Sequence, residues 1–267
     1  MRNELCWVTR LAPWLVVFLT VGCASVSSPS TPLSRASVSS LSPGLTPIRT
    51  VVVDAGHGGH DPGARHHGLR EKDLALDIAR RLNAELNDRG LSVVMTRDQD
   101  EFIILSRRPA LANRLEADLF VSVHINANRN RHVSGIEVYY PRESIVDASA
   151  PFPPQIQPSE VALPTVTVKK ILWDLVLVQS RRHSVRMASH ICRSMRDRLG
   201  VRCRGVKGAR FVVLREARMP AVLVEVGYVS NQREASRLAS TNYRQAVAQA
   251  IADGVVAYIR ELGLQHI

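Results

Sequence analysis

From about residue 48 onward, short apolar runs alternate with longer stretches in which apolar residues recur every three or four positions. The short runs predict strands at Thr50–Asp54, Leu91–Thr96, Asp118–His124, Gly135–Tyr140, Phe211–Leu214 and Ala221–Val226. Most of these runs lack polar alternation, which is typical of strands buried on both faces of a parallel sheet.

The longer stretches predict helices between these strands. The first helix ends at about Arg89, and three others cover Leu105–Leu115, Ser184–Leu199 and Val247–Ile259. A capping box at Asn231 and Glu234 predicts the start of a further short helix. Gly90 ends the first helix, and Pro109 makes the start of the second irregular. Because strands and helices alternate, the sequence predicts the α/β class. We expect a single domain with a six-stranded, mostly parallel, twisted sheet covered by helices on both faces.

An apolar segment near the amino terminus predicts export. Leu11–Val21 follows two arginines, carries no charge and is too short for a stable bilayer span, so residues 1–23 read as a signal. It ends at Cys23 and resembles a bacterial lipoprotein signal, in which this cysteine becomes the lipidated amino terminus. Thr20 departs from that pattern, which usually has leucine there. The alternative is a secretory signal cleaved nearby without lipidation, and both place the protein outside the cytoplasm.

Two segments lack a periodic apolar face. Residues 24–47 are rich in serine, proline and threonine and predict a flexible tether before a folded domain at 48–267. Residues 141–172 hold six prolines and predict an insertion in that domain. The insertion reads either as a lid or docking loop for an activator protein, or as a passive surface segment.

Net charge narrows the class of partner. The chain carries a formal charge of +11, which favours an anionic partner such as nucleic acid, a membrane surface or an acidic cell-wall polymer. No basic run interleaved with aromatic residues and no nucleic-acid motif occurs, so we expect no nucleic-acid binding.

Four cysteines are present, and two of them fall within the expected signal. Cys192 and Cys203 remain and could pair in an oxidising compartment. Cys192 falls on the apolar face of the helix predicted over Ser184–Leu199, where buried thiols are common. We therefore expect free thiols rather than a disulfide. No CxxC spacing indicates a cysteine metal site.

Candidate chemistry gathers near the predicted strand ends. His57 follows the first strand in VVVDAGHGG, Glu71 opens the first helix, and His124 closes the third strand. Ligands of α/β sheets bind at the carboxyl ends of the strands. Taken singly, each residue also has a simpler structural interpretation. His57 could be a turn residue, Glu71 could complement the helix dipole, and His124 could be a buried histidine at a strand end. Asp54, just before this glycine-rich turn, fits either a role behind a metal ligand or a turn-stabilising role.

Glu225 is harder to explain structurally, because it interrupts the apolar run AVLVEV. A buried carboxylate costs several kcal/mol unless a cation or hydrogen-bond donors compensate it. Two imidazoles and one carboxylate form a standard ligand set for catalytic Zn²⁺ with a fourth position left for water. A second carboxylate would then take the proton of that water. Together the four residues predict zinc-dependent hydrolysis of an amide.

Several short motifs follow one another in a fixed order along most of the folded part. They are DAGHGG at 54–59, DPGA at 61–64, EKDLAL at 71–76, TRD at 96–98, LSRR at 105–108, AN at 112–113, SVHINA at 122–127 and EVGYVSN at 225–231. Through them the sequence from about Arg49 to Leu262 resembles the zinc-dependent N-acetylmuramoyl-L-alanine amidases that cleave septal peptidoglycan.

This resemblance implies that His57, Glu71 and His124 bind one catalytic zinc ion and that Glu225 is the general base. The family hydrolyses the amide between N-acetylmuramic acid and L-alanine of the peptidoglycan stem peptide, in cell-wall remodelling or daughter-cell separation. We therefore expect a periplasmic monomer that acts on peptidoglycan. Lipid at Cys23 would anchor it to a membrane, and the residue after Cys23 favours the outer one.

Two other functions stay open at the level of sequence. A related zinc peptidase would use the same metal chemistry on a peptide bond within the stem. A non-catalytic wall-binding lipoprotein or activator would need no buried general base, which the presence of Glu225 argues against.

Overall fold

The computed structural model describes residues 48–142 and 166–264. The expected signal, the tether, Cys23 and most of the expected insertion lie outside the described residues and stay predictions. Within the described ranges, no helix is both long and apolar enough to cross a membrane.

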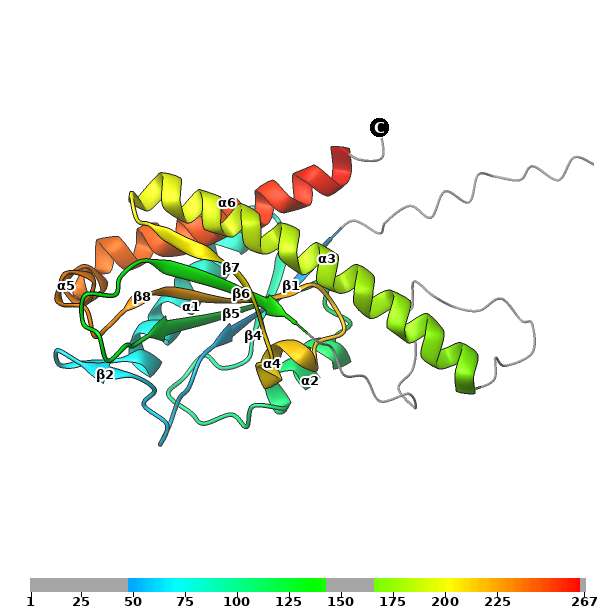
Figure 1. The fold of residues 1–267 in the computed structure, drawn as a ribbon, viewed down its shortest axis with the longest axis horizontal. Helices are drawn as coiled ribbons and strands as arrows, with labels where there is room; N and C mark the ends of the chain where they lie inside the picture. The colour runs from blue at the N-terminus through cyan, green and yellow to red at the C-terminus, as the bar shows by residue number, and fades with distance from the viewer. Residues whose placement is uncertain (1–47, 143–165, 265–267) are drawn as a thin grey trace, which may run out of the picture. The chain divides into compact units, whose positions relative to one another are not determined.

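A six-stranded sheet forms the centre of the fold (Figure 1). Its strands are β1 (Thr50–Ala55), β4 (Ser92–Met95), β5 (Leu119–Asn126), β6 (Ile136–Pro141), β7 (Cys203–Ala209) and β8 (Ala221–Tyr228). The strand order is β4-β1-β5-β8-β6-β7, and only the β6–β8 pair is antiparallel. A small hairpin, β2 (Arg65–His66) with β3 (Leu69–Arg70), stands apart from this sheet.

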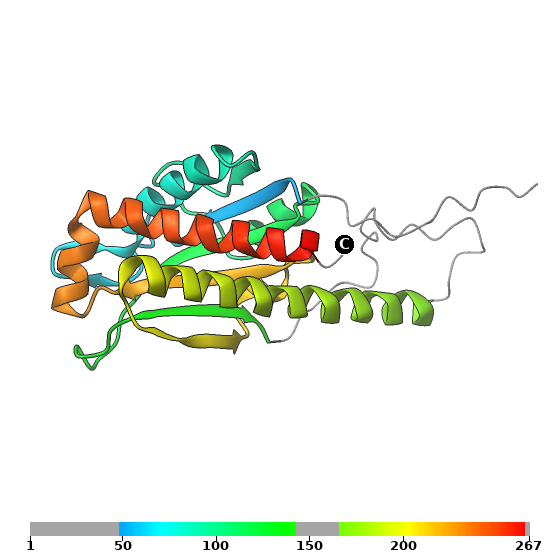
Figure 2. The same cartoon turned by 90° about the horizontal axis from the view of Figure 1, so that it is seen from above.

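Helices cover both faces of the sheet. They are α1 (Glu71–Asn87), α2 (Arg107–Arg114), α3 (Val166–Leu199), α4 (Val212–Arg215), α5 (Gln232–Ala239) and α6 (Thr241–Leu264). One core joins the sheet to α1, α3 and α6, and a smaller core joins the other face to α2 and α4. Figure 2 shows α3 and α6 side by side over the sheet. The predicted α/β class, with its mostly parallel six-stranded sheet, is confirmed.

Alternation along the strands decides which face carries the polar residues. In β1, Val51 and Val53 enter the larger core and Val52 the smaller one. Because successive side chains point to opposite faces, Asp54 lies on the same face as Val52. The same alternation in β5 and β8 puts His124 and Glu225 on this face, which α2 and α4 only partly cover.

The prediction of a strand at Phe211–Leu214 is wrong. These residues lead into the short helix α4, whose Val213 and Leu214 are buried in the smaller core. Periodicity cannot distinguish helix from strand in so short an apolar run. The sixth strand is instead β7, which the sequence analysis missed because this edge strand carries arginine, lysine and glycine and has no buried position.

The expectation of free thiols is also wrong. Cys192 on α3 and Cys203 at the start of β7 form a disulfide, with their Cα atoms 5.9 Å apart. Cys192 does pack against the larger core, as its helical position indicated. Without β7, however, nothing in the sequence placed Cys203 next to it.

The two ends of the expected insertion belong to regular elements. β6 ends at Pro141, and α3 already begins at Val166, well before the predicted helix start at Ser184. The capping box is confirmed only in part. The side chain of Asn231 accepts hydrogen bonds from the backbone N–H groups of Arg233 and Glu234, whereas the carboxylate of Glu234 bonds elsewhere.

Candidate metal centre

Three of the four predicted site residues come together at the carboxyl-terminal edge of the sheet. His57 follows β1, Glu71 is the first residue of α1, and His124 lies near the end of β5. One ligand atom from each lies within 4.8 Å of the others. Glu71 Oε2 is 3.1 Å from His57 Nε2, and Glu71 Oε1 is 2.9 Å from His124 Nδ1. Two imidazoles and one carboxylate therefore converge on one small volume.

Hydrogen bonds hold the carboxylate and the first imidazole in place. Glu71 accepts the backbone N–H groups of Ala64 at 2.8 Å and Ile125 at 3.0 Å, one on each oxygen. His57 Nδ1 is 2.7 Å from Asp61 Oδ2, so its Nε2 is the nitrogen that faces the cluster. A ring nitrogen held by a carboxylate in this way is typical of metal-ligating histidines.

The charges of the cluster reinforce one another. Burial alone would raise the pKa of Glu71, but His124 and His57 hold it far below its ordinary value. Burial alone would lower the pKa of His57, but hydrogen bonds and charge from Glu71 and Asp61 raise it to about 9. The site therefore favours a carboxylate with positive charge next to it, which is the electrostatic arrangement that a bound cation also satisfies.

A buried ion pair lies behind the cluster. Asp54 is fully buried and accepts hydrogen bonds from Arg108 at 2.8 Å, Thr96 Oγ1 at 2.7 Å and Ser122 Oγ at 2.6 Å. Burial would raise the pKa of Asp54, but Arg108 and the two hydroxyl groups lower it. Asp54 makes no hydrogen bond to a cluster residue, so its place is beneath the turn that carries His57.

Two buried arginines fix that turn through its backbone carbonyls. Arg108 donates to Ala55 O at 2.6 Å and His57 O at 2.8 Å. Arg97 donates to Ala55 O at 3.0 Å and Gly56 O at 2.7 Å. Sequence reasoning gave neither arginine, nor Asp61, a role in the site. Both arginines do lie in the quoted motifs TRD and LSRR, but only tertiary structure shows that they are buried beneath the turn.

His57 itself has a backbone φ of +57°, which is uncommon for a residue other than glycine. Its neighbours are small because space is lacking. A Cβ atom on Gly56 would collide with the ring of His124, and one on Gly63 would come 2.5 Å from Glu71 Oε2. The glycines of this turn therefore let the backbone approach the cluster closely.

Glu225 stands beside the cluster. It pairs with His124 across the β5–β8 register. Its Oε2 atom is buried and has no hydrogen-bond partner among the described residues. Burial, together with the nearby charges of Glu71 and Glu137, raises the pKa of Glu225 to about 7, although His124 and His57 act in the opposite direction. A buried polar atom left unpaired requires an explanation, because it costs stability.

Comparison with known proteins identifies the family of this chain. The sequence pattern of the N-acetylmuramoyl-L-alanine amidases matches residues 51–257. The chain belongs to the N-acetylmuramoyl-L-alanine amidase family. It is 36% identical over 211 residues to the amidase LytC of Bacillus subtilis, with 79% of this chain and 36% of LytC covered. It is 34% identical over 221 residues to the amidase AmiA of Escherichia coli, with 79% of this chain and 76% of AmiA covered.

Solved amidase structures share the fold. The amidase AmiC2 of Nostoc punctiforme aligns with a TM-score of 0.62 at 33% identity and covers 80% of this chain and 98% of its own. An amidase from Clostridium difficile 630 aligns with a TM-score of 0.64 at 29% identity and covers 80% of this chain and 98% of its own. The amidase match thus spans the sheet, the cluster and Glu225, whereas about a third of LytC is covered.

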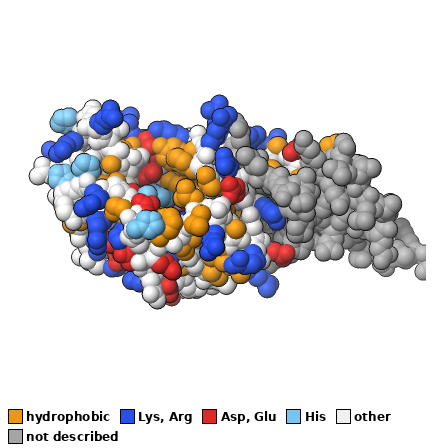
Figure 3. All heavy atoms as spheres, turned by 90° about the horizontal axis from the view of Figure 1, so that it is seen from below, with side chains coloured by type: hydrophobic (Ala, Val, Ile, Leu, Met, Phe, Trp, Pro, Cys, Tyr) orange, Lys and Arg blue, Asp and Glu red, His pale blue; other side chains and the backbone are white. Residues whose placement is uncertain are grey.

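The types of side chain on the surface of this amidase are unevenly distributed. Figure 3 shows a face on which histidine, acidic and apolar side chains gather, with lysine and arginine spread around them. Near the turn of His57, Phe102 is 43% exposed and stacks on His60 with ring centroids 4.1 Å apart.

Proposed function

We propose that this protein is a zinc-dependent amidase that hydrolyses the bond between N-acetylmuramic acid and L-alanine in peptidoglycan. The observation that carries the proposal is the unpartnered, buried carboxylate oxygen of Glu225 next to the cluster of His57, Glu71 and His124. Membership of the amidase family supplies the substrate class.

The donor set fits zinc. Two imidazole nitrogens and one carboxylate are the ligands of a catalytic zinc site with one position left for water. When bound there, zinc lowers the pKa of a water molecule and polarises a carbonyl oxygen. His57 and His124 supply the imidazoles and Glu71 the carboxylate, and Asp61 orients His57.

Glu225 is the proton carrier in this proposal. Its carboxylate takes a proton from the attacking water and returns it to the nitrogen of the leaving L-alanine. A general base works best when its pKa lies near the operating pH, and burial raises that of Glu225 to about 7. The lack of another hydrogen-bond partner leaves Oε2 available to accept this proton.

The substrate places the protein outside the cytoplasm. The disulfide between Cys192 and Cys203 agrees with an oxidising compartment. A lipid anchor at Cys23 stays a prediction, since Cys23 lies outside the described residues. The basic charge of the chain would favour the acidic wall, and wall binding that weakens in high salt would support that role.

Mass analysis of digested peptidoglycan tests the proposal. We expect intact stem peptides with L-alanine at the new amino terminus, together with glycan that lacks peptides. A chelator should stop the release, and added zinc should restore it. Peptides cut within the stem would instead support a zinc peptidase, and no soluble product at any zinc concentration would support a non-catalytic wall-binding protein.

A further inference from the structure

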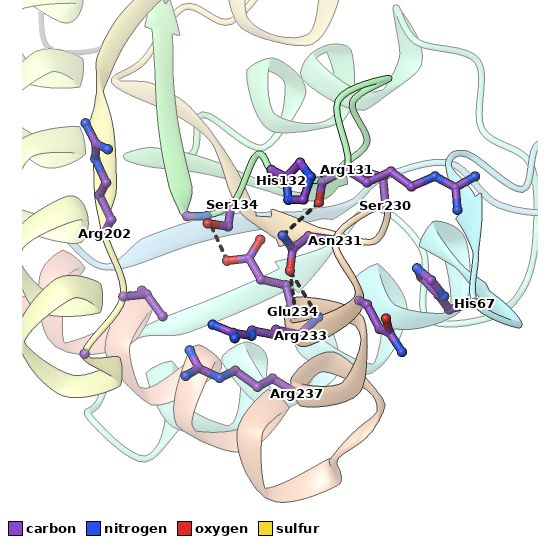
Figure 4. A pocket seen from close by; sticks show the side chains of 14 residues that line it. His67, Arg131, His132, Ser134, Arg202, Ser230, Asn231, Arg233, Glu234 and Arg237 are labelled. Carbon is purple, nitrogen blue, oxygen red and sulfur yellow. Dashed lines mark hydrogen bonds between the residues drawn. The ribbon is translucent and has the colours of Figure 1, made fainter.

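A second feature of the same sheet edge is a basic pocket with a volume of about 690 Å³ (Figure 4). It is enclosed by the loop after β5, the turn after β8, the start of α5, the turn between α3 and β7, and the β2–β3 hairpin. Its charged and titratable lining consists of Arg131, Arg202, Arg233, Arg237, His67, His132 and Glu234.

The pocket lies on the elements that also carry the candidate metal centre. β5 runs from His124 into the loop of Arg131, and β8 runs from Glu225 into the turn that opens α5. His67 comes from the hairpin that ends immediately before Glu71. Three elements thus lead from the cluster into the pocket walls, although His57, Glu71, His124 and Glu225 do not themselves line the pocket.

The pocket carries an excess of positive charge. Among the described residues, Arg131, Arg202 and Arg233 form no ion pair with an acidic side chain. The only carboxylate in the lining, that of Glu234, is 8% exposed. Its two oxygens accept the backbone N–H groups of Gly135 and Tyr228, each at 2.8 Å. The guanidinium groups therefore remain available to an anionic ligand.

We propose that this pocket binds the carboxylates of the stem peptide, on the peptide side of the bond to be cut. The inference rests on the proposed function, because it concerns the same substrate. Stem peptides carry carboxylates beyond L-alanine, and arginine matches a carboxylate with two parallel N–H donors.

Distance along the strands supports this assignment. Tyr228 lies three positions after Glu225 in β8, which is roughly 10 Å at about 3.3 Å per residue. The pocket residues Ser230 and Asn231 follow directly. An extended peptide advances by a similar distance per residue, so the third and fourth residues of the stem reach the arginines while its first residue lies beside Glu225.

The test compares two synthetic substrates. One is N-acetylmuramic acid joined to a tetrapeptide stem with free carboxylates, and the other has every carboxylate beyond L-alanine converted to an amide. We expect kcat/KM to be about tenfold higher for the acidic substrate than for the amidated one. In a calorimetric titration, the acidic free tetrapeptide should bind about tenfold more tightly than the amidated free tetrapeptide. Both preferences should decline as salt rises.

Variants connect the preference to the pocket. In Arg131→Ala/Arg233→Ala, kcat/KM for the acidic substrate should fall about tenfold while that for the amidated substrate stays the same. The lysine variants Arg131→Lys/Arg233→Lys keep the charge and should retain part of the preference. Arg260→Ala is the matched control, because this exposed arginine lies near the end of α6, away from α5 (Figure 1).

The outcomes are distinguishable. If the unmodified protein hydrolyses both substrates equally well, or if the arginine variants keep the preference, the pocket does not bind stem carboxylates and the proposed function is unaffected. If neither substrate is hydrolysed, the proposed function fails, and the titration with free tetrapeptide then decides the role of the pocket alone. The comparison within the unmodified protein requires no variant to fold.

Discussion

Removing the buried ion pair beneath the His57 turn should destabilise the whole protein. Arg108 and Asp54 are 2.8 Å apart, and their side chains are 2% and 0% exposed. Replacing Arg108 by methionine keeps most of the volume but leaves the Asp54 carboxylate with only two hydroxyl donors. Breaking one side of a buried pair costs about 3–5 kcal/mol, so we expect that loss in the free energy of unfolding.

A double-mutant cycle separates the ion pair from other effects. Asp54→Asn alone should also cost about 3 kcal/mol, because it leaves the Arg108 charge buried. The double variant should cost less than the sum of the single ones, by a coupling of about 1.5–3 kcal/mol. Urea unfolding in the presence of a chelator measures these values without a contribution from bound metal. Arg107→Met, at the exposed neighbouring position, is the control and should change stability by under about 0.5 kcal/mol.

Additive single-variant costs would refute this reasoning, as would a loss below about 1 kcal/mol in Arg108→Met. The ion pair also makes the stability of the fold depend on pH in the acid range. The folded-state pKa of Asp54 is lowered from 3.8. Its contribution to stability is therefore present above pH 3.8 and is lost as the pH falls through the folded-state value. Asp54→Asn should lack this part of the acid dependence, and unfolding free energies measured against pH would show it.

Two further predictions concern the cluster and the disulfide. Gly56→Ala should weaken zinc binding at least about tenfold, because the added Cβ displaces the ring of His124. Competition with a chromophoric chelator measures the zinc affinity. Gly263→Ala is the control and should have no effect, because a Cβ atom at Gly263 would point into open space. Replacing Cys192 and Cys203 by serine should lower the free energy of unfolding by about 2–3 kcal/mol, because the disulfide closes a loop between residues 11 positions apart. Equal stability of the unmodified protein with and without reductant would contradict this stabilising role.

The sequence was informative where one local pattern carried the signal. His57 follows an apolar strand, His124 lies near the end of one and Glu225 interrupts one, so their positions at the sheet edge could be predicted from periodicity alone. Their convergence with Glu71 could be inferred only from the family resemblance, because 53 residues separate Glu71 from His124 and spacing says nothing about such a distance.

Other features depend on contacts that no local pattern encodes. Arg97 and Arg108 look like surface arginines in the sequence, and only the packed turn shows them to be buried donors. The edge strand β7 has no apolar alternation, so its pairing, and with it the disulfide to Cys192, was missed. The basic pocket is assembled from four separate segments whose arginines have no periodic relation.

The most direct test of the proposed chemistry is Glu225→Gln. This change keeps the size of the side chain and removes its ability to accept a proton. We predict that the variant binds one zinc ion per chain as tightly as the unmodified protein and releases stem peptides from peptidoglycan at least about 100-fold more slowly. An unchanged rate at full zinc occupancy would contradict the role of Glu225 as the general base.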